Sequence, residues 1–287
     1  METAAHAPAL PRTTSHPLEQ TDDSLGISTR HRTLWWLLRI GAAMCFIGHG
    51  AFGVLQKAEW LPYFALVGIP APLALSLMPV VGVVDIAVGI SVLVSPRPVF
   101  LLYMAVWGLW TAMLRPLAGD GAWEMLERAG NYGVPMALLL LAGIPRSFGA
   151  WRSRVPTGEI CLTRLRHAGA MLRLSTAMLL AGHGALGALT GKTLLVTHYA
   201  ALGLPSETVA LVGWLELALA AAVLARPGVA LLLFVCGWKV TTEALFPLSG
   251  APLWEFIERG GSYAAPLGAA LIITMSKQLP VHTGGAS

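Results

Sequence analysis

The sequence predicts an all-α membrane protein with eight transmembrane helices, arranged as two parallel four-helix repeats. Composition is the first reason: 55% of the 287 residues are hydrophobic and only 12% are charged, at a mean hydropathy of +0.67. A soluble globular domain has about 25% charged residues. The second reason is a series of apolar runs, each close to the ~20 helical residues that cross a hydrocarbon core. The third is an internal duplication.

The apolar runs divide evenly between the two halves of the chain. No alternating strand pattern competes with them, and helices satisfy their own backbone hydrogen bonds in lipid. The predicted spans cover residues 34–55, 73–95, 98–118 and 131–148, then 169–190, 208–225, 228–249 and 261–276.

Two motifs occur twice. The stretch GHGAFG at 48–53 recurs as GHGALG at 182–187, a shift of 134 residues, and WEMLERAGNY at 123–132 recurs as WEFIERGGSY at 254–263, a shift of 131. The predicted organisation is therefore a disordered tail (1–33), a first repeat (34–148), a basic connector (149–168), a second repeat (169–279) and a short tail (280–287).

Charge orients the helices. With both ends of the chain and the connector on one side, that side collects 13 of the 19 Lys and Arg residues. The positive-inside rule then places both termini in the cytoplasm, most simply at a bacterial inner membrane, with no cleaved signal peptide. An even number of helices per repeat inserts both copies the same way up, which disfavours an inverted-repeat transporter.

Several function classes are excluded by what the sequence lacks. The net charge of +4 comes without a basic patch of interleaved aromatic residues, so no nucleic-acid partner is expected. Cys45, Cys161 and Cys236 form no Cys-x-x-Cys pair or disulfide framework, and no metal site is predicted. Nucleophile-elbow, P-loop and dinucleotide signatures are also missing.

A glycine-flanked histidine marks the first helix of each copy, His49 and His183. Glycines let a neighbouring helix or a flat ligand approach the imidazole. One interpretation is tight packing around a hydrogen-bonded buried histidine. The other is a ligand site, either for a quinone carbonyl or, as the weaker alternative, for the iron of haem b, which both histidines would bind only if both helices lined the axis.

The second helix of each copy carries one acid, Asp85 and Glu216. A carboxylate within a spanning helix costs about 2.5–3.5 kcal/mol on insertion scales, so it needs a reason. We consider two: proton transfer or polar ligand contact, and a structural hydrogen bond to the histidine of the same copy.

The third helices differ between the copies. The first ends in Arg115, whereas the second carries Lys239 and Glu243 one helical turn apart, a pair expected to neutralise itself. The two halves are therefore not expected to be functionally equivalent.

The motif W-E-x-x-E-R-x-G-x-Y-x-x-P precedes the fourth helix of each copy. It predicts a short amphipathic helix on the outer membrane surface, either a lid that closes the bundle or a ligand-binding element. Pairs four residues apart, Glu124 with Arg128 and Glu255 with Arg259, would each contribute about 0.2–0.5 kcal/mol. The charged residues assigned to this lid are Glu124, Glu127, Arg128, Glu255, Glu258 and Arg259.

A family resemblance is carried by the segment GIPAPLA at 68–74 and the acid-bearing glycine-rich helix that follows it. Together with Gly203-Leu204-Pro205 and the helix of Glu216, it resembles the DoxX-like family of four-helix membrane proteins over residues 39–145 and 173–279. This chain departs from the family in having two units, and in carrying Asp85 where a glutamate is expected. The resemblance implies a quinone-linked role with partner subunits.

These observations favour a quinone-associated membrane subunit of a respiratory or redox complex. Its outer-facing pockets would be formed by the histidine, the acid and the Glu/Arg lid of each copy, together with the third-helix charges Arg115, Lys239 and Glu243. Two alternatives remain: a non-enzymatic scaffold or assembly subunit, and a proton-coupled small-solute transporter. Broken helices around a midplane site would favour the transporter, and the sequence shows none clearly.

Overall fold

The computed structural model describes residues 17–277 except 157 and 159, with side chains from residue 29 onward. Every regular element in this part of the chain is helical. In order, these are α1 (Pro17–Val54), η1 (Ala58–Trp60), α2 (Leu61–Leu66), α3 (Ala71–Val94), α4 (Pro98–Leu117), α5 (Ala122–Glu127), α6 (Ala129–Ala142), α7 (Phe148–Arg152), α8 (Leu162–Ala188), α9 (Thr193–Ala201), α10 (Glu207–Ala225), α11 (Val229–Leu248), α12 (Leu253–Glu258) and α13 (Gly260–Ser276).

Five of the described helices are long and apolar enough to cross a membrane, namely α3, α4, α10, α11 and the Thr29–Val54 part of α1. Helices α8 and α9 form a sixth candidate if the bent pair, whose axes differ by 80°, is one span. Helix α6 is apolar but has 14 residues, fewer than the ~20 that cross a bilayer. These helices make the chain a membrane protein, and all eight predicted spans are helical over most of their length.

The boundaries differ from the predicted ones at three places. Helix α1 begins at Pro17 and not at residue 34, because a helix nucleated in an apolar segment extends at one hydrogen bond per residue. Helix α6 ends at Ala142, six residues early, where Gly143 takes a φ of 80°. The predicted connector contains α7, and α8 begins within it at Leu162. The predicted tails at 1–16 and 280–287 lie outside the described residues.

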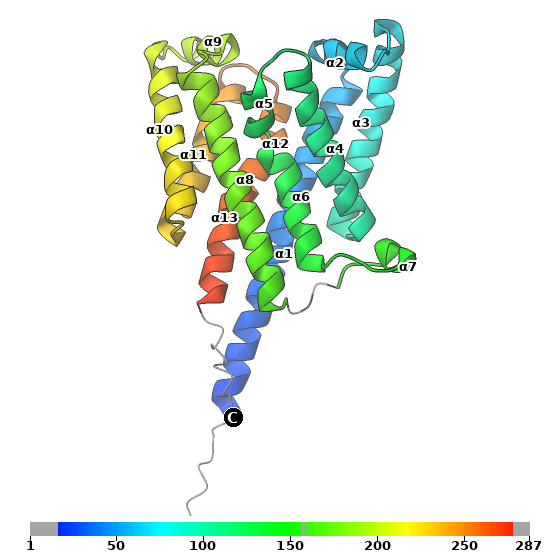
Figure 1. Ribbon diagram of the computed structural model, residues 1–287, viewed down its shortest axis with the longest axis vertical. Helices are drawn as coiled ribbons and strands as arrows, with labels where there is room; N and C mark the ends of the chain where they lie inside the picture. Colours follow the sequence, from blue (N-terminus) through cyan, green and yellow to red (C-terminus); the bar gives the residue numbers. More distant parts are fainter. Residues whose placement is uncertain (1–16, 157, 159, 278–287) are drawn as a thin grey trace, which may run out of the picture.

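A close crossing of α6 and α13 lies at the centre of the bundle. Helices α6 and α13 pack against each other, and a Cβ at Gly130 would lie 2.5 Å from the carbonyl carbon of Gly261, so only glycine permits this approach. Figure 1 shows α3 and α4 on one side of the centre and α10 and α11 on the other, with α2 and α9 across the same end. The start of α1 and the end of α13 lie at the opposite end.

The two halves of the chain are interlocked. Helix α1 packs on α12 and α13 of the second half, and α8 packs on α5 and α6 of the first. Gly48 and Gly182 make this possible: a Cβ at Gly48 would lie 2.5 Å from the backbone nitrogen of Glu258, and one at Gly182 would overlap the backbone of Glu127. The glycines beside each histidine therefore admit the WExxER segment of the other half.

An arginine ties each acid-bearing helix to its neighbour: Arg39, which is buried, in the first half, and Arg173, which is partly buried, in the second. The Nε atom of Arg39 donates to the carbonyl of Val92 at 2.8 Å, and Arg173 donates to Val223 at 3.0 Å. Each guanidinium also donates to the next carbonyl, so it satisfies acceptors at a helix C-terminus that have no intrahelical partner. These arginines fix the ends of α3 and α10 against α1 and α8.

Candidate functional site

Each histidine bonds to the acid of its own half, as one of the two interpretations predicted. The Nδ1 atom of His49 lies 2.8 Å from Oδ2 of Asp85, and that of His183 lies 2.5 Å from Oε2 of Glu216. Both carboxylates are 0% exposed. Because the carboxylate bonds to Nδ1, only Nε2 of each imidazole can donate or accept a hydrogen bond to another group.

The two acids differ in their remaining donors. Asp85 accepts from the Tyr103 hydroxyl and from the Trp107 indole N–H, each at 3.3 Å. Glu216 accepts from an indole N–H at 3.1 Å and from Lys239 Nζ at 3.3 Å. Besides its histidine, Asp85 therefore has only neutral donors. Glu216 instead has a cationic donor, Lys239, which also pairs with Glu243.

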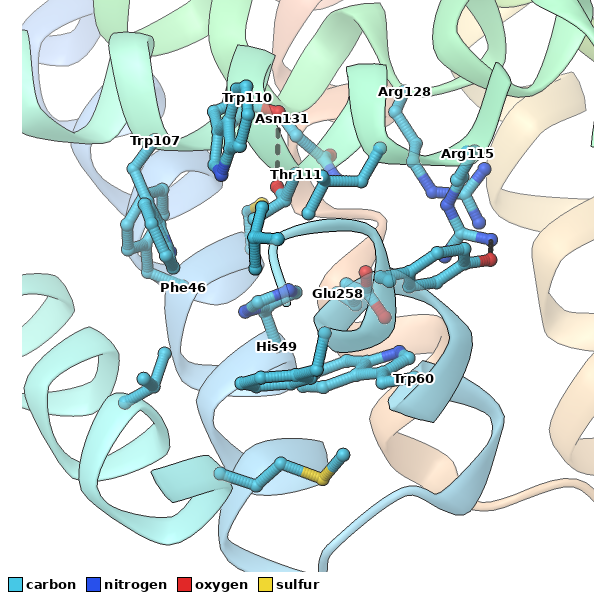
Figure 2. A pocket seen from close by; sticks show the side chains of 18 of the residues that line it. Phe46, His49, Trp60, Trp107, Trp110, Thr111, Arg115, Arg128, Asn131 and Glu258 are labelled. Atoms are coloured by element: carbon cyan, nitrogen blue, oxygen red, sulfur yellow. Dashed lines mark hydrogen bonds between the residues drawn. The ribbon is translucent and has the colours of Figure 1, made fainter. Parts of the chain in front are cut away.

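A cavity of about 270 Å³ lies beside His49 (Figure 2). The ring of Trp60 stacks on the imidazole, with centroids 4.5 Å apart and planes at 24°. Val67 and Trp110 line the cavity and are 51% and 39% exposed, so the cavity opens to the surface beside α2 and α4. Its other walls are mainly apolar and aromatic, formed by Cys45, Phe46, Phe64, Ile69, Leu77, Met78, Val81, Trp107, Gly108 and Leu114.

A few polar groups gather in the cavity. Asn131 is 7% exposed, and its amide makes no hydrogen bond within the described part of the chain. Arg115 donates one hydrogen bond, to the Tyr63 hydroxyl at 3.1 Å. Glu258, from the second half, lies on the same wall. The cavity thus offers an amide, an imidazole, a guanidinium and a carboxylate among apolar walls.

The second half has charged side chains at two positions where the first has small residues, one of which, Gly108, lines the cavity. The 131-residue shift aligns Gly108 with Lys239 and Ala112 with Glu243. Lys239 and Glu243 are each 1% exposed and pair at 2.8 Å, as the sequence predicted. Large, paired side chains therefore stand in the second half at positions that a glycine and an alanine hold in the first.

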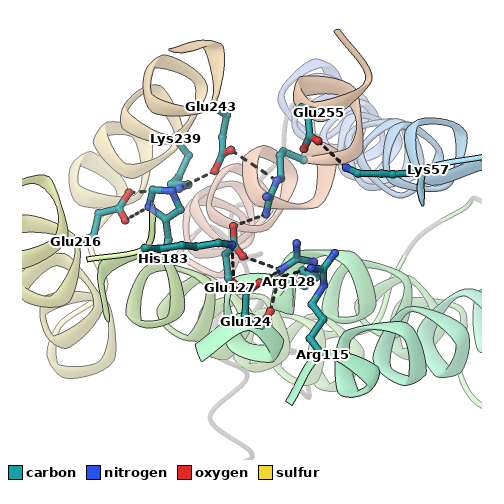
Figure 3. Close-up of polar contacts among 12 residues, drawn as sticks. Lys57, Arg115, Glu124, Glu127, Arg128, His183, Glu216, Lys239, Glu243 and Glu255 are labelled. Atoms are coloured by element: carbon teal, nitrogen blue, oxygen red, sulfur yellow. Dashed lines mark hydrogen bonds and ion pairs between the residues drawn. The ribbon is translucent and has the colours of Figure 1, made fainter. Parts of the chain in front are cut away.

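Four charged residues of the WExxER segments are buried inside the bundle, so the prediction of a lid on the outer membrane surface is wrong for Glu124, Glu127, Glu258 and Arg259. Figure 3 shows the cluster that they form. Glu124 and Glu127 are each 4% exposed, and Glu258 and Arg259 are each 8% exposed. Arg128 contacts both first-half carboxylates, at 2.9 and 2.7 Å. Glycine at the contacting positions of α1 and α8 lets the segments enter, and opposite charges make their burial tolerable.

The predicted pair of Glu255 with Arg259 does not form. Arg259 bonds to Glu127 of the first half at 2.8 Å and lies 3.6 Å from Glu243. Glu255 pairs with Lys57 at 2.7 Å, again across the halves. The predicted first-half pair of Glu124 and Arg128 is confirmed at 2.9 Å. Contacts between the halves replace the local contact because interlocking brings Glu127 within reach of Arg259 and Lys57 within reach of Glu255.

Charge neutralisation sets the protonation of this cluster. Burial opposes ionisation of Glu127, but Arg259 and Arg128 outweigh it and hold the pKa of this carboxyl well below its usual range. Burial also opposes the charge of Arg259, yet Glu127 and Glu243 raise the pKa of its guanidinium. For Glu258, His49 and Arg259 outweigh burial and lower the pKa. Glu127, Glu258 and Arg259 are therefore ionised at neutral pH.

Lys57 and Lys192 complete the charged cluster and were not predicted. Lys192 lies 2.5 Å from Glu124, and Arg115 lies 3.6 Å from the same carboxylate. Both lysines line a second cavity of about 120 Å³, which shares Trp60, Arg115 and other residues with the first. The sequence contained a signal for these two lysines, because a lysine follows the Gly-His-Gly helix in both copies. Asn131 and Trp60 had no such signal, since the second copy replaces them.

The structure does not bring His49 and His183 to one site. Each bonds within its own half, and only His49 lines the 270 Å³ cavity. No group of three or more His, Cys, Asp or Glu side chains suited to a metal ion occurs among the described residues. A haem held between both histidines is therefore not supported by this arrangement.

No protein-family model, curated protein or solved structure matches this chain.

Proposed function

We propose that this chain is a quinone-associated integral membrane subunit of a respiratory or redox complex, as the resemblance to the DoxX-like family implies. In this proposal the eight predicted segments span a bacterial inner membrane as two parallel repeats, with both termini cytoplasmic. The charged cluster then lies toward the outer side. Partner subunits would supply or accept electrons, since no redox-active metal site is proposed in the chain itself.

The cavity beside His49 is the observation that carries the proposal. Ligand pockets usually measure about 300–1,000 Å³, with apolar walls and a few placed polar groups. At about 270 Å³ this cavity suits a ring system more than a whole prenylated molecule. Exposed Val67 and Trp110 mark an opening through which an isoprenoid tail would extend into lipid. The stacked Trp60 supplies a flat surface for the ring.

The polar residues have distinct roles in this proposal. A bound quinone would supply reversible electron and proton uptake. Asn131 has a free amide that can donate to a ring carbonyl. Asp85 orients His49 through Nδ1, so that Nε2 can accept a proton from a hydroxyl or, when protonated, donate to a carbonyl.

Binding of a neutral naphthoquinone tests the proposal. Purified full-length protein in neutral detergent should show saturable quenching of tryptophan fluorescence by 2-methyl-1,4-naphthoquinone, because three tryptophans line the cavity. Thr111→Phe should abolish saturable quenching by filling the cavity. Thr241→Phe is the matched control, since it adds the same ring at an exposed position of α11. Equal quenching in both variants, or none in the parent protein, would reject the site.

One observation favours the proton-coupled transporter as a second candidate. Helices α5 and α12 each end next to an arginine, and the following helix starts directly after it, at Ala129 and Gly260. Charged breaks of this kind occur in transporters. Proteoliposomes loaded with a pH-sensitive dye distinguish the candidates: solute-dependent acidification without quinone binding would favour transport. The scaffold alternative predicts neither signal.

A further inference from the structure

A second polar site lies far from the charged cluster, where α1 approaches the end of α3. Arg32, Arg39 and Arg154 line a cavity of about 210 Å³ there, together with Trp35 and Trp36. It lies toward the end of the molecule that holds α7 and the start of α1 (Figure 1). Arg154 comes from the segment between α7 and α8, so three separate parts of the chain meet.

The cavity concentrates positive charge, and no acidic side chain is among the described residues that line it. Within the part of the chain that the structure describes, no carboxylate pairs with any of the three arginines. Two of the arginines donate to backbone carbonyls: Arg39 donates to Val92, and Arg154 donates to Val94 at 3.0 Å. Carbonyl groups satisfy donors but leave the net charge in place, so an anion would be stabilised here.

Two tryptophans give the cavity the character of a membrane interface. Trp36 is 46% exposed, and the Arg39 guanidinium lies 4.2 Å from the centroid of its ring. Trp35 is 2% exposed, and its indole N–H has no acceptor among the described residues. Tryptophan is enriched at headgroup depth in membrane proteins. The cavity thus combines clustered guanidinium groups, an unused donor and an apolar neighbour that faces outward.

We propose that this cavity binds the phosphodiester headgroup of an anionic phospholipid. Basic pockets between transmembrane helices on the cytoplasmic side recognise such headgroups. The phosphate oxygens would accept from Arg32 and Arg154, whose side chains are exposed, and the acyl chains would follow the exposed surface of Trp36 and Ile40. A lipid fits better than a free phosphate because exposed apolar surface continues directly from the arginines.

The second half of the chain lacks this site. The 134-residue shift aligns Arg32 with Arg166, but Trp35 and Trp36 with Gly169 and Ala170. Arg166 is exposed on α8 without the tryptophans. It therefore provides an internal control: an arginine at the corresponding position that does not line the cavity.

Lipid binding to the purified full-length protein tests the proposal. In neutral detergent, native mass spectrometry should show at least about tenfold tighter binding of dioleoylphosphatidylglycerol than of dioleoylphosphatidylcholine, given two exposed guanidinium groups. Arg32→Gln and Arg154→Gln should each weaken phosphatidylglycerol binding about fivefold, the factor for ~1 kcal/mol per arginine. Both side chains are exposed, so the variants should fold, and their melting in phosphatidylcholine checks this. Arg166→Gln should bind like the parent protein.

Three results would overturn the proposal. Equal affinity for the two lipids would show that headgroup charge is not recognised. A loss in Arg166→Gln as large as in Arg154→Gln would show that general surface charge, and not this cavity, attracts the lipid. Full competition by millimolar inorganic phosphate would assign the cavity to a free phosphate ion.

Discussion

Arg259 should be the side chain on which association of the two halves depends most. It comes from the second half, is 8% exposed, and bonds to Glu127 of the first half at 2.8 Å while lying 3.6 Å from Glu243. Replacing Arg259 with Met keeps an unbranched apolar chain of similar length but removes the charge. Two buried carboxylates then lose a cationic partner.

The expected cost follows from burial. Removing one partner of a buried ion pair costs about 3–5 kcal/mol, because the other charge remains in a low-dielectric site. An exposed pair contributes about 0–1 kcal/mol. Lys57→Met is the matched control, since it also breaks a pair between the halves, but one whose side chains are 23% and 21% exposed. From the sequence, Arg259 was expected to contribute only about 0.2–0.5 kcal/mol in a local helical pair, so the structure raises the expected cost several-fold.

Unfolding in detergent, followed by intrinsic tryptophan fluorescence, measures both variants. Arg259→Met should lower the free energy of unfolding by about 3 kcal/mol or more, and Lys57→Met by less than about 1 kcal/mol. Adding Glu127→Gln to Arg259→Met should restore part of the loss, because the stranded carboxylate becomes neutral. Equal, small losses in the two single variants would refute the assignment of Arg259 as a buried cross-link.

Three further predictions follow from the same structure. The pKa of Glu127 in the folded protein lies below its unfolded value of about 4.3. The stabilisation by this carboxylate is therefore complete above that pH and is lost as the pH falls through the folded pKa. The melting temperature should stay constant from pH 7 to about pH 5 and fall in stronger acid, and an unchanged melting temperature at pH 3 would contradict this. Transplanting the second half's residues as Gly108→Lys with Ala112→Glu should fill the cavity and remove naphthoquinone quenching, whereas retained quenching would place the ligand elsewhere. Because Cys161 is exposed, it is first replaced by serine; in that background Ala122→Cys and Ser153→Cys should react with an impermeant thiol reagent from opposite sides of the membrane, and labelling of both from one side would overturn the proposed orientation.

Local patterns in the sequence predicted local features well. Apolar run length predicted the helices because a spanning helix is defined by its own residues. The bond of His49 to Asp85, and that of His183 to Glu216, match one of the two interpretations of the acids, because a buried polar group needs a partner. The pair of Lys239 with Glu243 was predicted because both residues lie on one helix face.

Interactions between distant segments were predicted poorly. The repeat suggested that each WExxER segment would cover the histidine of its own copy, on the membrane surface. In the structure Gly48 packs on Glu258 and Gly182 packs on Glu127, so each WExxER segment contacts the glycine-histidine helix of the other half. A sequence pattern records which residues can pack closely, but not which of two similar surfaces they meet.

By itself, the sequence predicted that the helices lie in lipid and that the chain contains a repeated unit. Hydrophobic content requires lipid around the helices, and the repeated motifs identify the unit that was duplicated. Only the tertiary structure decided that the halves interlock, that the Glu and Arg side chains of the repeated motif are buried together, and that Lys239 and Glu243 stand where the first half leaves space beside His49. The physical reason is that burial and ion pairing depend on distances between helices, and these are set by packing of the whole bundle.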